Sequence, residues 1–157
     1  MAIPVKLKDI IDGMEFQSDE IASYLNKRTG EVVTITDEEF RAAEDNEPIE
    51  DFPKWQHENI KRAREVLETD DYISLPSKSD IHEYEIMERF CLSITDDEIR
   101  ERMYRSIKGS GAFRRFKDNI QRNNRVEDWY KYREEAIKQI AIDWCEENDI
   151  EFTEQRS

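Results

Sequence analysis

The chain has 157 residues, of which 39% are charged and 37% hydrophobic, and its formal net charge is −14. This length can bury a core without disulfides or metal ions. The negative charge opposes adhesion to nucleic acid or anionic membranes, and no stretch approaches the roughly 20 apolar residues that cross a bilayer. The first 15 residues lack the apolar run of a signal peptide, so we expect a cytoplasmic protein without a membrane partner.

The N-terminal third predicts a helix followed by a β-hairpin. Apolar residues at positions 7, 10, 11 and 14 mark one face of a short amphipathic helix. Strands are expected at residues 21–25 and 32–35, joined by a turn over residues 26–30 in which Gly30 suits a positive φ.

The middle of the chain predicts two helices and a third strand. Thr36 and Glu39 have the spacing of a capping box, so a helix should run to about Glu44. After a loop at residues 45–53, a second helix is expected over residues 54–69, followed by a strand at residues 72–75. The inner face of that second helix is predicted to carry Trp55, Ala63, Val66 and Leu67.

The C-terminal half predicts four helices. One buried helix is expected over residues 79–94, and a second, capped at Thr95, should run to Gly109 with Ile99, Met103 and Ile107 inward. A third begins after Gly111, and a fourth covers residues 126–147. The third should bury Phe113, Phe116 and Ile120, and the fourth Trp129, Tyr132, Ala136, Ile137, Ile140 and Trp144.

These elements predict an α+β fold in which an N-terminal hairpin, with or without a third antiparallel strand, packs on a mostly helical C-terminal half. We expect a single domain over residues 1–157. Its parts would be a segment of helix, hairpin and acidic helix (1–76), a helical bundle (77–150) and a disordered tail (151–157).

One basic segment lies within this acidic chain: residues 101–133 carry 10 basic and 4 acidic side chains. A glycine-containing turn before a helix could hold an anion on free backbone N–H groups. The alternative is a simple turn between two helices, with Arg115 and Arg122 solvated on the outer face of the following helix. The candidate anion-binding residues are Lys108, Gly109, Ser110, Gly111, Arg114, Arg115 and Lys117.

Arg133 falls within the apolar stripe of the last helix, where an unpaired guanidinium would be costly. It is interpreted either as a structural ion pair or as the floor of a cleft that binds a carboxylate or phosphate. Trp129 and Tyr130 beside the arginines could also stack on single-stranded nucleic acid. The net charge and the core-facing phase of Trp129 disfavour that partner.

Catalytic signals are weak. His57 and His82 are the two histidines, and His82 lies about 180° from Cys91 around the predicted helix, so these two cannot form a catalytic pair. The two cysteines, Cys91 and Cys145, are expected to be buried free thiols. We therefore predict no catalytic constellation, no metal site and no cofactor.

Three stretches carry a resemblance to a known family. They are SYLNKRTGEVV (residues 23–33), GAFRRFKD (111–118) and the WY-x-x-R pattern of Trp129, Tyr130 and Arg133 with Ala136 and Trp144. In these features the chain resembles the bacterial uncharacterised protein family 0158 from about Leu7 to Ile150, the acidic loop at residues 45–55 apart. The resemblance implies a small bacterial cytoplasmic protein and no particular activity.

Taken together, the sequence favours a non-catalytic protein–protein interaction module of unidentified partner, because oppositely charged surfaces give electrostatic complementarity. The alternative is an anion-, nucleotide- or nucleic-acid-binding protein that uses the turn from Gly109 to Lys117 and Arg133.

Overall fold

The computed structural model describes residues 4–154, which form two compact units. The sheet unit comprises residues up to Ile81 and from Ile140 onward, and the helical unit comprises His82–Gln139. These units differ from the expected parts 1–76 and 77–150, because the last turns of the final helix belong with the sheet unit. The organisation as a single domain stays a prediction.

The sheet unit is built on a three-stranded antiparallel sheet of strand order β3-β2-β4. Strands β2 (Ile21–Asn26) and β3 (Val32–Thr36) form the predicted hairpin, and β4 (Tyr72–Ser74) pairs with the other side of β2. Gly30 in the turn has φ 77°, as its position predicted. The predicted α+β class and third strand are confirmed.

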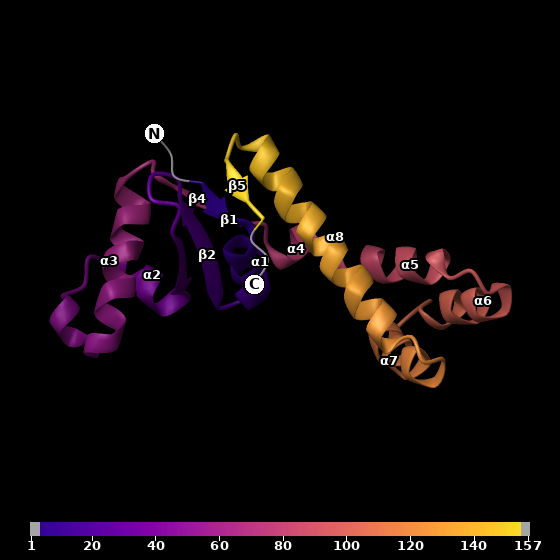
Figure 1. Cartoon of the computed structure of the whole chain (residues 1–157). Helices are drawn as coiled ribbons and strands as arrows, with labels where there is room; N and C mark the ends of the chain where they lie inside the picture. The colour runs from indigo at the N-terminus through magenta and orange to yellow at the C-terminus, as the bar shows by residue number, and fades with distance from the viewer. Residues whose placement is uncertain (1–3, 155–157) are drawn as a thin grey trace. The chain divides into compact units, whose positions relative to one another are not determined.

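Helices cover both faces of this sheet (Figure 1). Helix α1 (Leu7–Phe16) packs against the face that carries Ser23, where Gly13 permits a close approach: a Cβ there would lie 2.6 Å from the Leu75 side chain. Helices α2 (Asp37–Glu44) and α3 (Lys54–Glu68), linked through a 3-10 turn (Ile49–Asp51), lie on the opposite face. The core on that side comprises Val33, Ile35, Ala43 and Ala63, with Tyr24, Phe40, Val66 and Tyr72 packed around it.

The capping box at the start of α2 is confirmed. The Thr36 side chain accepts the backbone N–H of Glu39, and the Glu39 carboxylate accepts the backbone N–H of Thr36. Glu39 is fully buried and also accepts two hydrogen bonds from the Asn59 amide. The cap therefore also ties α2 to α3.

The predicted inner face of α3 is wrong at its two ends. Trp55 is 75% exposed and Leu67 is 46% exposed, whereas Gln56, Ile60 and Ala63 are buried. Each helical residue is turned by about 100° from the next, so a stripe that includes Gln56 rather than Trp55 leaves the indole outside. A buried glutamine gave no apolar signal at that position.

The two ends of the chain meet in a parallel pair of short strands, β1 (Val5–Lys6) and β5 (Phe152–Thr153). The expected disordered tail at residues 151–157 is therefore wrong for β5, and residues 155–157 lie outside the described part of the chain. Alternate apolar residues of β1 and β5 remove surface from water, which a disordered tail could not do.

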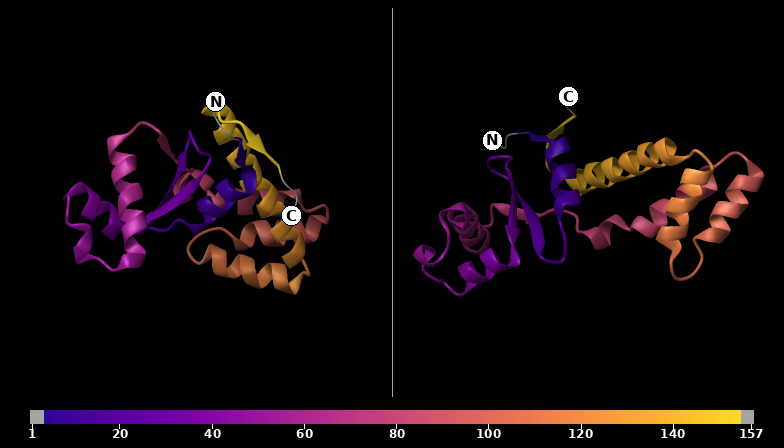
Figure 2. Two further views of the ribbon diagram at one scale, coloured as in Figure 1. Left: turned by 60° about the vertical axis from the view of Figure 1, so that its left-hand side comes forward. Right: turned by 90° about the horizontal axis from the view of Figure 1, so that it is seen from below.

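The helical unit contains α5 (Glu83–Ser93), α6 (Asp97–Ser106), α7 (Ala112–Arg122) and the first part of α8 (Val126–Glu147). Figure 2 shows α5, α6 and α7 from two further directions. Its core is an aromatic cluster in which Phe90 and Trp129 both meet Phe116 edge to face, at centroid distances of 6.0 Å and 4.8 Å.

Several local expectations for these helices are corrected. The single helix expected at residues 79–94 is two helices, because His82 adopts φ 54° between α4 (Lys78–Ile81) and α5, where the chain passes between units. Asp96 rather than Thr95 caps α6, since its carboxylate accepts the Ile99 N–H, and the helix ends at Ser106 instead of Gly109. Aspartate is among the strongest N-cap residues.

The predicted inner face of α7 is confirmed at Phe116 and Ile120 and wrong at Phe113. Phe113 is 51% exposed, and the buried stripe is Ala112, Phe116 and Ile120. The spacing i, i+4 and i+8 places these residues on one face of a helix, as does the predicted set, so the apolar pattern alone does not choose between Ala112 and Phe113. In the structure the small Ala112 takes the inward position next to the turn.

None of the described helices is both long and apolar enough to cross a membrane. Along α8, Trp129 and Ile137 are buried as predicted, while Tyr132, Ala136, Ile140 and Trp144 are half-buried.

Both cysteines are buried free thiols, as predicted. Burial raises the pKa of Cys91 and of Cys145 to about 11, from an ordinary value of 9.0. We expect both thiols to react slowly with a thiol-specific reagent at pH 8 and rapidly in denaturant. Because the pKa of each thiol is higher in the folded chain, the buried protonated thiols contribute fully to the free energy of unfolding below about pH 9. This contribution is lost as the pH rises through about 11. Fast labelling of the native chain at pH 8 would contradict this expectation.

Candidate functional site

The predicted basic turn lies between α6 and α7, and Gly109 and Gly111 both adopt left-handed conformations, with φ 83° and 78°. The Arg115 side chain returns to this turn and donates to the carbonyls of Ser106, Lys108 and Ser110 at 2.6–2.7 Å. The expectation of a solvated Arg115 is therefore wrong. Its guanidinium satisfies carbonyls left free at the end of α6, so it is held by the chain itself.

Lys108 also contacts groups of the same chain. Its ammonium lies 3.9 Å from the centre of the Tyr104 ring and 3.8 Å from a carboxylate oxygen of Glu88. Lys108 is exposed nonetheless, and so are Arg114 and Lys117, which belong to α7 together with the exposed Phe113. Of the predicted anion site, the structure brings together Lys108 through Gly111 with Arg115, and leaves Arg114 and Lys117 on the surface.

Arg133 forms an ion pair within the helical unit. Its Nε donates to the Glu83 carboxylate at 2.9 Å, and a second guanidinium nitrogen donates to the same oxygen. The two side chains are 28% and 35% exposed. The ion pair expected by the structural interpretation of Arg133 is present, and it joins α8 to the start of α5.

The predicted aromatic platform does not form as a pair. Trp129 is 9% exposed and packs against Phe90 and Phe116, whereas its neighbour Tyr130 is 64% exposed. A base could stack on Tyr130 but not on Trp129, whose faces are covered by the aromatic cluster.

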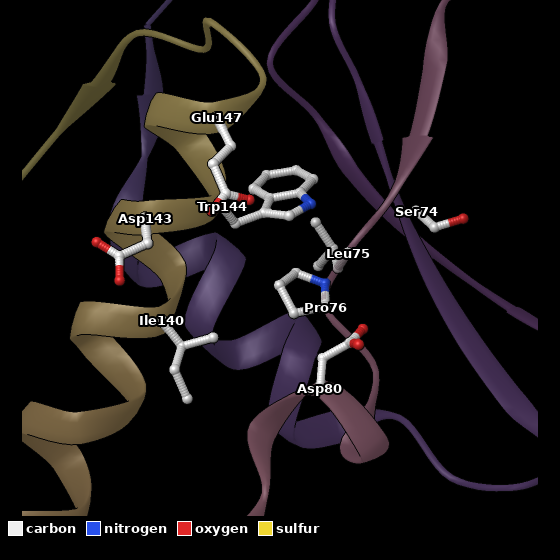
Figure 3. A pocket seen from close by; sticks show the side chains of 8 residues that line it. All are labelled: Ser74, Leu75, Pro76, Asp80, Ile140, Asp143, Trp144 and Glu147. Atoms are coloured by element: carbon white, nitrogen blue, oxygen red, sulfur yellow. The ribbon is translucent and has the colours of Figure 1, made fainter.

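The sheet unit contains a pocket that the sequence interpretation missed. It has a volume of about 440 Å³ and lies between the segment after β4 and the last turns of α8. Figure 3 shows the Trp144 indole directed toward Leu75 and Pro76, with the Glu147 side chain beside it and Asp80 and Asp143 farther out. The lining residues are Ser74, Leu75, Pro76, Asp80, Ile140, Asp143, Trp144 and Glu147.

The charge around this pocket is strongly negative. Asp80, Asp143 and Glu147 belong to a unit whose sequence carries 26 acidic and 11 basic residues, whereas the helical unit carries 12 and 13. Within residues 4–154, no three His, Cys, Asp or Glu side chains are close enough together to hold a metal ion. An indole face with carboxylates nearby is instead suited to a cationic side chain.

The sequence does not predict the pocket because its two halves lie at least 60 residues apart along the chain. Helical phase predicts a buried Trp144 within a helical bundle, whereas the side chain is half-buried and belongs to the sheet unit. One local signal was present: Ile140, Asp143 and Glu147 are spaced i, i+3 and i+7, which places them on one side of α8.

The fold and these sites define an α+β protein in which a helix-covered antiparallel sheet with an acidic pocket is accompanied by a helical unit with a basic turn. Residues 2–157 match the family described as "Uncharacterised protein family (UPF0158)", so the chain belongs to that family. The resemblance read from the sequence is thereby confirmed.

A curated relative is the UPF0158 protein PA5073 of Pseudomonas aeruginosa, which is 25% identical over 73 residues. The alignment covers 46% of this chain and 48% of that protein, so it spans about half the length of the relative. No solved structure matches the chain.

Proposed function

We propose that this protein is a non-catalytic binding module whose sheet unit takes a basic segment of a partner protein in the Trp144 pocket. The observation that carries the proposal is the combination of an aromatic wall and three carboxylates in a hollow of an acidic unit.

An arginine or lysine side chain has the chemistry that this pocket would accept. Its charged group can lie over the Trp144 ring, which is worth about 0.5–2 kcal/mol depending on desolvation. Its aliphatic stem can pack on Leu75, Pro76 and Ile140, while Asp143 and Glu147 attract the charge. The wider negative field of the sheet unit would steer a basic partner toward the pocket.

The alternative function is anion or nucleic-acid binding by the helical unit. The observation in its favour is the exposed pair Arg114 and Lys117, with Tyr130 as a possible stacking surface. It is less well supported, because Arg115 and Arg133 already donate to groups of the same chain. Stabilisation of the full chain by phosphate, nucleotides or oligonucleotides in a melting screen would favour it.

Binding of a basic probe to the pocket can be measured directly. An end-blocked peptide of alternating arginine and serine is titrated into the full chain by calorimetry at low and moderate salt. We expect D143N with E147Q to weaken binding by about tenfold, or about 1.4 kcal/mol. A matched pair, D45N with E50Q, removes the same charge from exposed positions in the same unit and should change binding less than about twofold.

Equal weakening by the two pairs would show that the peptide senses only the total charge. That result, or the absence of binding at low salt, would overturn the pocket as the receptor site. W144L adds a second check, because it retains an apolar side chain and removes only the aromatic face.

A further inference from the structure

Strand β3 forms one edge of the sheet. The hydrogen bonds at both ends of the hairpin determine which residues of β3 bond to β2 and which point outward. Asn26 N–H donates to the Glu31 carbonyl at 2.8 Å, and Asp37 N–H donates to the Glu20 carbonyl at 2.9 Å. In an antiparallel pair, hydrogen-bonded and non-hydrogen-bonded positions alternate. The pairs Tyr24–Val33 and Ala22–Ile35 are therefore the hydrogen-bonded ones.

Val32 and Thr34 occupy the alternate positions, so their backbone N–H and C=O groups point away from β2. Within residues 4–154, no backbone hydrogen bond outside the hairpin ladder involves either residue. The next outward position, Thr36, is already used, since its N–H donates to Glu39. The edge thus offers four unsatisfied backbone groups over two residues, the arrangement that accepts an added strand.

A groove accompanies this edge on the α1 side of the sheet. It has a volume of about 500 Å³ and lies between α1 and β3. Phe16, which is 64% exposed, forms its apolar wall, and Val32 and Thr34 line the strand side. A strand added to β3 would direct alternate side chains toward this same face, and one of them would enter the groove.

Carboxylates surround the groove. Asp9 and Asp12 come from α1, and Glu31, whose carboxylate lies 3.9 Å from an Arg62 guanidinium nitrogen, directly precedes β3. All three are exposed. This charge favours a partner with basic residues on either side of an apolar one, and it disfavours a second copy of the chain, whose own acidic edge would face this one.

We propose that β3 binds an extended segment of a partner protein as an additional strand, with an apolar side chain of that segment beside Phe16 and flanking basic residues near Asp9, Asp12 and Glu31. This inference rests on the proposed protein-binding role, but it concerns a surface separate from the Trp144 pocket. Different measurements would disprove the β3 proposal and the pocket proposal.

The first test uses an end-blocked peptide of eight alternating valine and lysine residues and leaves the protein unchanged. Amide hydrogen exchange followed by NMR should show fast exchange at Val32 and Thr34 in the free chain and slow exchange at Val33 and Ile35. The peptide should slow Val32 and Thr34 by at least about tenfold, because an added strand supplies the missing acceptors. N-methylation of the peptide amides that face β3 should abolish binding, whereas N-methylation on the other edge should not.

Variants of the protein provide the second test. V32P removes an outward N–H without removing a ladder bond to β2, and F16S removes the apolar wall. Each substitution should weaken binding of the valine–lysine peptide by about tenfold. F113S is the matched control, since it removes an exposed phenylalanine from the helical unit and should change affinity less than about twofold.

Three results would overturn the proposal. They are unchanged exchange at Val32 and Thr34 with the peptide present, equal binding of the N-methylated and parent peptides, and a dimer of the full chain that V32P dissociates. D143N with E147Q should leave this peptide's effect on Val32 unchanged. If only the arginine–serine peptide fails to bind, the pocket proposal is wrong. If only the slowing of exchange at Val32 and Thr34 is absent, the β3 proposal is wrong.

Discussion

Replacing Phe116 with alanine is expected to destabilise the helical unit by about 3–5 kcal/mol, the range measured for large-to-small changes at buried aromatic positions. Phe116 is 2% exposed and meets Phe90 and Trp129 edge to face. Its removal would leave a cavity at the centre of the aromatic cluster and break both ring contacts, each worth about 0.5–1.5 kcal/mol beyond the burial. A small helical unit has little stability in excess of this loss, so F116A should unfold it at ambient temperature.

Denaturant unfolding followed by near-ultraviolet circular dichroism measures the effect, because Trp129 reports on this cluster. F113A is the control: its ring is 51% exposed, and its loss should cost less than about 0.5 kcal/mol. If F116A and F113A proved equally stable, the assignment of Phe116 to the core would be wrong.

The second large effect is expected at Glu39. E39A should reduce the free energy of unfolding of the sheet unit by about 2–4 kcal/mol, because the carboxylate is fully buried and accepts hydrogen bonds from Thr36 and Asn59. Alanine would leave the Thr36 N–H and the Asn59 amide without an acceptor and would also leave a void between α2 and α3.

E38A isolates the ordinary contribution of a charge in the first turn of the same helix. Glu38 is exposed, so its loss should cost only about 0.3–1 kcal/mol through the helix dipole. Thermal and urea unfolding of the two variants should therefore differ clearly. Similar stabilities for E39A and E38A would contradict the buried-network explanation.

Features with local chemical causes were predicted well from the sequence. The hairpin follows from β-branched residues flanking a turn with Gly30, and the Thr36–Glu39 cap follows from a fixed spacing of two side chains. The bounds of α8, Val126–Glu147, agree with the prediction because the apolar stripe continues over six turns. Each of these signals lies within a few residues of the structure that it determines.

Errors arose where two neighbouring helical phases were both apolar. Trp55 and Phe113 were placed inside because aromatic residues outweigh Gln56 and Ala112 on any hydrophobic scale, yet the smaller neighbours face the core. A turn of 100° separates these alternatives, and only the surrounding elements decide between them. The break at His82 is a different error, because its φ of 54° has no signature in the apolar pattern.

The candidate site shows the same limit. Composition identified the basic segment, and helical phase suggested that Arg133 needs a partner, which the structure supplies as Glu83. The sequence did not reveal that the Arg115 guanidinium donates hydrogen bonds to three backbone carbonyls, because backbone acceptors have no signature in the side-chain pattern. The Trp144 pocket depends on contacts between distant segments, and the β3 edge depends on strand order.

The pairing of β1 with β5 has a consequence for biosynthesis. The partners are separated by nearly the whole described chain, so the nascent polypeptide can form its hairpin and the intervening helices well before β1 finds its neighbour. Until Phe152 and Thr153 leave the ribosome, Val5 and Lys6 have no strand partner, so the sheet unit is completed only after the whole helical unit has been synthesised.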